Sequence, residues 1–165
     1  MSDSQARITP QEAWKRLADG NARFVEGRPN HPNQDATRRE SLAEGQNPFA
    51  VIFGCSDSRL AAEIIFDLGL GDTFVVRTAG QVLSSASLGS LEYSVAELDV
   101  PLMVVLGHDS CGAVTAASQS YDSGEMPPGF VRNLVEENRT AVVGMFYNLR
   151  DGKAELVFSS HDLDS

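Results

Sequence analysis

The sequence predicts an α/β fold: a mostly parallel central sheet of about four strands plus a C-terminal antiparallel hairpin strand, flanked by helices. Short apolar runs, typical of strands buried on both faces, alternate with longer segments that fit helices. Glycine, proline, asparagine and aspartate bound these runs and mark turns. Such alternation is typical of parallel strands joined by crossover helices.

An N-terminal helical arm is expected at about residues 9–45. It begins with a capping box, because Thr9 and Glu12 enclose a proline that suits the first helical position. The apolar stripe of this helix must be covered by the core or by a partner subunit. The stripe consists of Trp14, Leu17 and Phe24. A second helix is expected over 36–44, ending at Gly45.

Strands and one clear crossover helix follow the arm. The strand candidates are 49–53, 73–76, 102–106 and 141–146. A helix is expected over 87–98, where leucine and valine recur at helical spacing behind a serine-rich start. The last strand is expected to turn at Asp151 and Gly152 into a hairpin with 154–158.

Composition indicates one globular domain spanning residues 1–165. The formal net charge of −10 disfavours nucleic acid and anionic membrane surfaces as partners. The chain has neither the apolar core of a signal peptide nor an apolar run of about 20 residues, so a cytoplasmic protein is expected. The acidic tail at 159–165 is expected to be mobile, and His161 within it is not expected to bind a ligand.

Two short motifs contain both cysteines of the chain. Cys55 follows the first predicted strand, and His108 and Cys111 follow the third. Because the carboxyl ends of parallel strands line the crevice where ligands bind, the motifs can be neighbours. Two sulfurs and one imidazole suit zinc, and Asp57 could add an oxygen ligand. Cys111 would also lie at a helix start, where backbone amides favour a thiolate. The alternative is two buried structural thiols.

The chain resembles the β-class carbonic anhydrases in a series of motifs that occur in the family's order. The motifs are CSDSR at 55–59, FVVR at 74–77, LEYSV at 91–95 and GHDSCG at 107–112. RTAG at 77–80 makes it most similar to the bacterial and mycobacterial-type members. The resemblance runs over about 13–118 and again over 141–156.

The resemblance implies a lyase that hydrates carbon dioxide reversibly to bicarbonate and a proton. One zinc ion per chain would be bound by Cys55, His108 and Cys111, and hydroxide on the zinc would attack the substrate. Asp57 would either bind the metal or pair with Arg59, so that this pair gates the site and orients the nucleophile.

The resemblance also implies a substrate cleft at a dimer interface. Its residues would be Gln46, Phe74 and Tyr93, although an aromatic residue in a strand or helix is more often plain core. A homodimer or a dimer of dimers is therefore expected.

One departure from the family pattern lies before the last strand. Relatives have a long helical stretch after the segment resembling 131–136, whereas here 137–140 leads almost directly into 141–144. The sequence also fits two rival functions. One is an enzyme similar to carbon disulfide hydrolases, and the other is a zinc-binding pseudo-enzyme in which Asp57 stays on the metal and closes the site.

Overall fold

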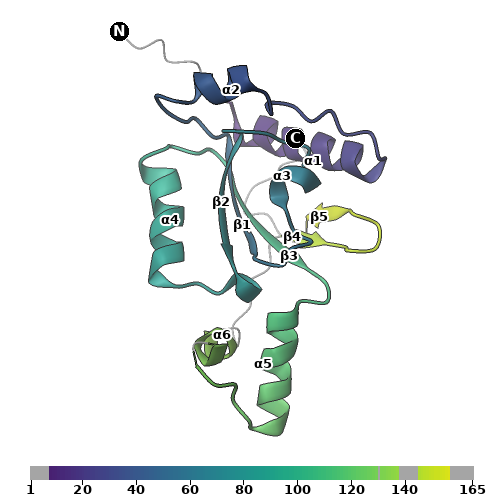
Figure 1. Cartoon of the computed structure of the whole chain (residues 1–165), viewed down its shortest axis with the longest axis vertical. Helices are drawn as coiled ribbons and strands as arrows, with labels where there is room; N and C mark the ends of the chain where they lie inside the picture. Colours follow the sequence, from purple (N-terminus) through teal and green to yellow (C-terminus); the bar gives the residue numbers. More distant parts are fainter. Residues whose placement is uncertain (1–7, 130, 138–144, 157–165) are drawn as a thin grey trace.

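The computed structural model describes residues 8–129, 131–137 and 145–156, and it has the expected α/β architecture (Figure 1). The strands are β1 (Ala50–Cys55), β2 (Thr73–Thr78), β3 (Met103–His108), β4 (Met145–Tyr147) and β5 (Ala154–Leu156). The helices are α1 (Pro10–Val25), α2 (Ala36–Ser41), α3 (Ala62–Ile65), α4 (Ser85–Ala96), α5 (Gly112–Ser123) and α6 (Val131–Glu137), with a 3₁₀ turn η1 (Ala79–Gln81). No helix in these ranges is long and apolar enough to cross a membrane.

The sheet has the strand order β2-β1-β3-β4-β5. β1 pairs in parallel with β2 and β3, β3 pairs in parallel with β4, and β5 runs antiparallel to β4. The register places Cys55 opposite Thr78 and Gly54 opposite Leu106. The carboxyl ends of β1, β2 and β3 therefore meet at one edge of the sheet.

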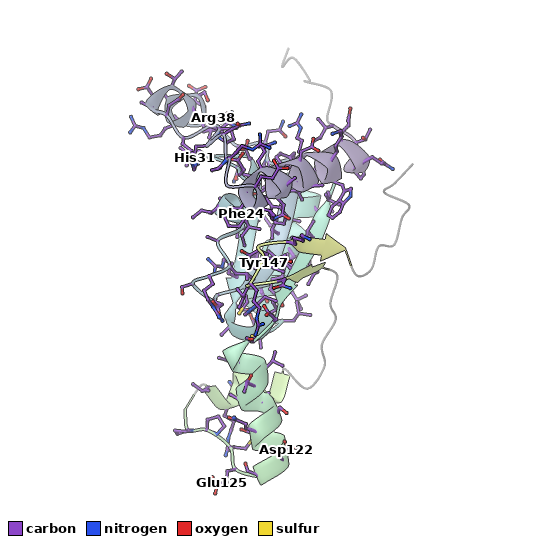
Figure 2. The ribbon with its side chains drawn as sticks, turned by 90° about the vertical axis from the view of Figure 1, so that its right-hand side faces the viewer. Phe24, His31, Arg38, Asp122, Glu125 and Tyr147 are labelled. Carbon is purple, nitrogen blue, oxygen red and sulfur yellow. The ribbon has the colours of Figure 1, made fainter. Side chains whose placement is uncertain are left out.

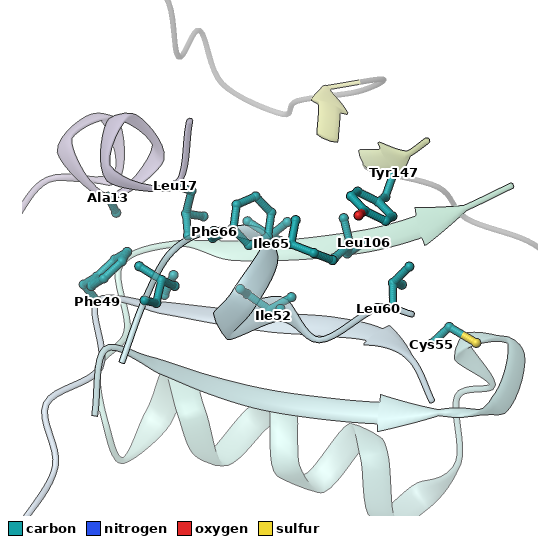
Figure 3. Close-up of a cluster of buried hydrophobic side chains, with 14 residues drawn as sticks. Ala13, Leu17, Phe49, Ile52, Cys55, Leu60, Ile65, Phe66, Leu106 and Tyr147 are labelled. Carbon is teal, nitrogen blue, oxygen red and sulfur yellow. The ribbon is translucent and has the colours of Figure 1, made fainter. Parts of the chain in front are cut away.

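Alternating side chains of β1 enter two hydrophobic clusters, one on each face of the sheet. Ala50 and Ile52 belong to the cluster under α1 and α3, where Leu17 and Phe66 are also buried (Figure 3). Val51 and Phe53 belong to the opposite cluster, with Leu91 of α4. Burial of each valine, leucine, isoleucine or phenylalanine side chain among them stabilises the fold by about 1.5–3 kcal/mol. The central strand is thus held rigidly from both sides.

The capping box at the start of α1 is confirmed, with Glu12 N donating to Thr9 Oγ1 at 3.2 Å and Thr9 N donating to Glu12 Oε2 at 2.7 Å. Farther along, α1 passes very close to the end of α3. A Cβ atom at Gly20 would lie 1.8 Å from Phe66 O. Only glycine allows this approach.

Asp67 fastens the loop after α1 to the body of the protein. Its side chain is 1% exposed and accepts hydrogen bonds from Arg23 Nε at 2.6 Å and from the backbone amides of Asn30 and His31, both at 2.9 Å. A buried carboxylate is stable only with such partners. Figure 2 shows His31 and Arg38 in this upper part of the molecule.

Several element boundaries differ from the expected ones. α2 ends at Ser41, because Leu42 N and Ala43 N bond to carbonyls three residues back, as in a tight final turn. α4 starts earlier than expected, because Ser84 and Ser87 form a capping box. β1 and β3 extend by two residues, so that Cys55 and His108 are the last residues of their strands. α3 and α6 were not expected.

Some expectations fall outside the described residues. They are the first part of the last parallel strand at 141–144, the end of the hairpin strand at 157–158, and the tail at 159–165 with His161.

Candidate metal centre

Three potential metal ligands converge at the carboxyl edge of the sheet. Cys55 ends β1, His108 ends β3, and Cys111 lies directly before α5. One ligand atom from each residue lies within 4.8 Å of the other two. The structure therefore brings the two motifs together, as the sequence predicted.

The spacing of the two sulfurs fits one shared ion. Cys55 Sγ and Cys111 Sγ are 3.9 Å apart. Two sulfurs bound at about 2.3 Å to one tetrahedral zinc lie about 3.8 Å apart. A disulfide would need about 2.05 Å, and both cysteines are free thiols.

His108 is oriented as metal-binding histidines usually are. Its Nδ1 lies 2.8 Å from Asp109 O, so that nitrogen carries the proton and donates it to the carbonyl. The other ring nitrogen, Nε2, is buried and has no hydrogen-bond partner in the described part of the chain. A buried polar atom without a partner is costly unless something binds it. With the two sulfurs beside it, this lone pair fits a metal ion.

Backbone amides support the Cys55 sulfur. Asp57 N lies 3.4 Å and Gly80 N 3.3 Å from Cys55 Sγ. Gly80 has a φ of 65°, the left-handed region that glycine adopts without strain. The two amides therefore hold the Cys55 sulfur in place at the carboxyl end of β1.

The pKa of the Cys111 thiol is raised, although its position at a helix start suggested a lowered pKa. Burial raises the pKa of the Cys111 thiol and outweighs the backbone amides of Val114 and Ala113, which lower it, and the nearby Cys55 raises it further. The backbone amides at the helix start thus favour the thiolate, as expected, but burial and Cys55 outweigh them. A bound cation would be needed to stabilise that form.

Asp57 is turned toward Arg59 and is not a member of the three-residue cluster. Arg59 Nε donates to Asp57 Oδ1 at 2.8 Å, and Nη2 donates to Oδ2 at 2.7 Å. The side-chain hydrogen bonds from Arg59 hold the pKa of the Asp57 carboxyl well below its usual range, despite partial burial. Asp57 is therefore a carboxylate at any physiological pH.

Comparison with known proteins agrees with this geometry. The family model described as carbonic anhydrase matches residues 50–143, which is more than half of the chain. The chain belongs to the carbonic anhydrase family.

Individual relatives of this family agree. The chain is 65% identical over 127 residues to a carbonic anhydrase of Mycolicibacterium smegmatis, covering 77% of this chain and 62% of that protein. It is 62% identical over 134 residues to carbonic anhydrase 2 of Mycobacterium tuberculosis, covering 81% and 65% of the two chains. The chain thus spans less than two thirds of the length of these relatives.

The fold is that of the β class of carbonic anhydrases. A β-carbonic anhydrase of Aspergillus fumigatus superposes with a TM-score of 0.58 at 22% identity, covering 92% of each chain. One of two tetrameric β-carbonic anhydrases of Sordaria macrospora superposes with a TM-score of 0.55 at 23% identity, covering 72% of this chain and 85% of that one.

The three residues expected to form the substrate cleft lie away from the metal centre within one chain. Phe74 and Tyr93 contact each other, with ring centroids 6.2 Å apart, beside α4. Phe74 is the second residue of β2, about 13 Å along the strand from Thr78 at the carboxyl edge. Gln46 is exposed and precedes β1, at the opposite end of that strand.

Sequence reasoning missed the residues that support the ligands. Arg77 and Gly80 contact the Cys55 turn, and Asp109 Oδ1 accepts a hydrogen bond from Leu149 N at 3.0 Å, which ties the His108 loop to the chain after β4. The available signal was the RTAG segment at 77–80, because its first two residues end the strand that lies next to β1.

Proposed function

We propose that the protein is a zinc-dependent carbonic anhydrase that converts carbon dioxide and water reversibly to bicarbonate and a proton. The observation that carries the proposal is the cluster of Cys55, His108 and Cys111, in which a buried Nε2 atom without a partner stands beside two sulfurs. Membership of the carbonic anhydrase family points to the same reaction.

Zinc bound by these three residues would act as a Lewis acid that activates a water molecule in its fourth position. Asp57 would not occupy that position in this conformation, because both of its carboxylate oxygens accept hydrogen bonds from Arg59. This pairing supports an open site over one closed by Asp57. In the proposed mechanism, Asp57 would be paired with Arg59 in this way during turnover.

Asp57 would orient the attacking water. Its Oδ2 accepts a hydrogen bond from Arg59 Nη2 and retains a lone pair for a second donor. Because Arg59 keeps the pKa of Asp57 low, the carboxylate accepts a proton in a hydrogen bond and does not supply one. Arg59 is half exposed and also contacts Ser110 O at 3.4 Å, so it links the two loops that hold the ligands.

A second copy of the chain is part of the proposal, as is a cytoplasmic location. Gln46, Phe74 and Tyr93 cannot reach the metal centre of their own chain, so a cleft that contains them would have to be completed by a partner subunit. The exposed face of α4 is apolar at Leu88 and Val95, which suits a protein interface. The fungal relatives from Sordaria macrospora are described as tetrameric.

The test is zinc content together with stopped-flow hydration of carbon dioxide, in wild-type protein and in two histidine variants. His108→Asn should lose both zinc and activity, because it removes the imidazole ligand. His31→Asn is the matched control, since His31 uses only its backbone amide to bind Asp67 and asparagine tolerates its φ of 50°.

Zinc-loaded wild-type protein without hydration activity would contradict the proposal, as would His108→Asn protein that keeps its zinc. The same samples assayed with carbon disulfide distinguish the related hydrolase activity.

A further inference from the structure

Arg77 reaches from β2 across to the turn that contains the first metal ligand. Its Nε donates to Cys55 O at 2.8 Å, and its Nη2 donates to Asp57 O at 2.6 Å. Arg77 lies opposite Gly54 in the parallel register of β1 and β2. One guanidinium thus binds the carbonyl groups on both sides of Ser56.

These two carbonyls lie where the sheet ends. The last backbone hydrogen bond between the two strands runs from Ser56 N to Thr78 O at 3.0 Å. Beyond it the Asp57 carbonyl accepts a hydrogen bond from Leu60 N at 2.9 Å, which closes the turn on itself but does not tie the turn to β2. The Arg77 side chain supplies that tie, because it joins both carbonyls to β2 past the last backbone hydrogen bond.

The interaction differs from an ordinary ion pair. Arg77 is half-buried, and within the described residues it forms no salt bridge with a carboxylate. The guanidinium presents its donors in a rigid planar fork, so two bonds from one side chain fix the relative position of two acceptors. Those acceptors belong to the residue that carries the metal-binding sulfur and to the residue that carries the proposed orienting carboxylate.

We infer that Arg77 is a positioning residue of the metal centre, which fixes the turn at 55–57 so that Cys55 Sγ and the Asp57 carboxylate keep their places. The expected effect on zinc binding rests on the proposed function. The clamp on the turn is a property of the protein alone. Gly80 N, three residues along the same segment, contributes the amide that binds Cys55 Sγ.

The experiment compares Arg77→Met with Arg38→Met. Arg38 is the matched control, because its Nε also donates to a backbone carbonyl, Leu70 O at 2.9 Å. Arg38 itself lies in the helical arm. Two quantities are measured: amide hydrogen exchange at 56–59 in protein stripped of metal, and the affinity for Zn²⁺ by competition with a chelator.

Arg77→Met should speed exchange in this turn about tenfold or more, because charged hydrogen bonds are lost. It should weaken zinc binding about 10- to 100-fold, the usual effect of losing a residue that supports a ligand. Arg38→Met should change neither. Arg77→Lys should recover these properties only in part, since an ammonium group lacks the planar fork.

The two readouts separate failure of this inference from failure of the proposed function. Unchanged exchange at 56–59 in Arg77→Met would overturn the clamp, whatever the zinc result. Faster exchange with unchanged zinc affinity would overturn the positioning role, as would full recovery in Arg77→Lys. Wild-type protein that binds no zinc would instead overturn the proposed function, while the exchange result would still decide on the clamp.

Discussion

At the scale of single residues, the pair of Asp57 and Arg59 is joined by two parallel hydrogen bonds. The pair adds little to stability. Arg59 is 51% and Asp57 17% exposed, and exposed ion pairs typically contribute about 0–1 kcal/mol. The value of the pair lies in placement. It keeps a charged carboxylate two residues from Cys55 without letting it enter the cluster of ligands.

Asp57→Asn should keep zinc and lose most of the hydration activity. The amide preserves the shape of the side chain but removes the charge that accepts the hydrogen bond of the attacking water, and a loss of about 100-fold is expected. Stopped-flow assays and zinc analysis measure the two properties separately. Asp19→Asn is the control, because it breaks an exposed pair with Lys15 far from the centre. Equal loss of zinc and rate would instead indicate that Asp57 acts mainly as a ligand.

At the scale of elements, the sequence was sufficient to bring the two motifs together. Cys55 and His108 follow short apolar runs that are typical of buried strands, and parallel strands end at a common edge. The support of these residues was not predictable, because Arg77 and Asp109 act through backbone carbonyl and amide groups of distant segments. Such contacts leave no periodic pattern in the sequence.

The helical arm is also held by a residue that no pattern in the sequence singled out, Asp67. Asp67 carries a positive φ of 47° and is buried among its three donors. Burial raises the pKa of Asp67, but the hydrogen bonds from Asn30 N, Arg23 and His31 N outweigh it and hold the pKa below 3.8. The folded protein therefore favours the charged form.

Asp67→Asn should lower the free energy of unfolding by about 2 kcal/mol, because hydrogen bonds to a charged group are lost. Since the folded-state pKa lies below the unfolded value of 3.8, the stabilisation is complete above about pH 4 and is lost as the pH falls through the folded-state pKa. Denaturant unfolding at pH 7 and at pH 3 measures the difference between wild type and variant.

Asp122→Asn, a change on the exposed end of α5 visible in Figure 2, is the control and should leave stability unchanged at both pH values. A destabilisation by Asp67→Asn that grows as the pH falls would contradict this account of the arm.

At the scale of the whole molecule, some helices cover the faces of the sheet and others do not. α1 and α3 cover one face of the sheet and α4 the other, whereas α5 and α6 extend away from it (Figures 1 and 2). The sequence predicted the α/β class from strand and helix alternation. It did not predict this uneven cover, because the alternation gives the order of the strands and helices and not how closely each helix packs on the sheet.

The outer face of α4 is the surface on which assembly is expected to depend. Leu88 and Val95 are seven residues apart, so two helical turns place them on one side of α4, where they are 46% and 48% exposed. Tyr93, proposed for the substrate cleft, is 48% exposed on the same helix. Apolar side chains at this level of exposure favour contact with a second copy of the chain.

The double change Leu88→Glu and Val95→Glu should convert the proposed dimer to monomer, because two carboxylates would be desolvated in each half of the proposed interface. Sedimentation equilibrium measures the mass. Hydration activity should fall while zinc is retained, since a monomer keeps its ligands but lacks a cleft completed by the partner. Ile64→Glu is the control, because Ile64 is 63% exposed on α3, on the other face of the sheet. A double variant that remains dimeric, or an Ile64→Glu protein that dissociates equally, would show that α4 is not the interface.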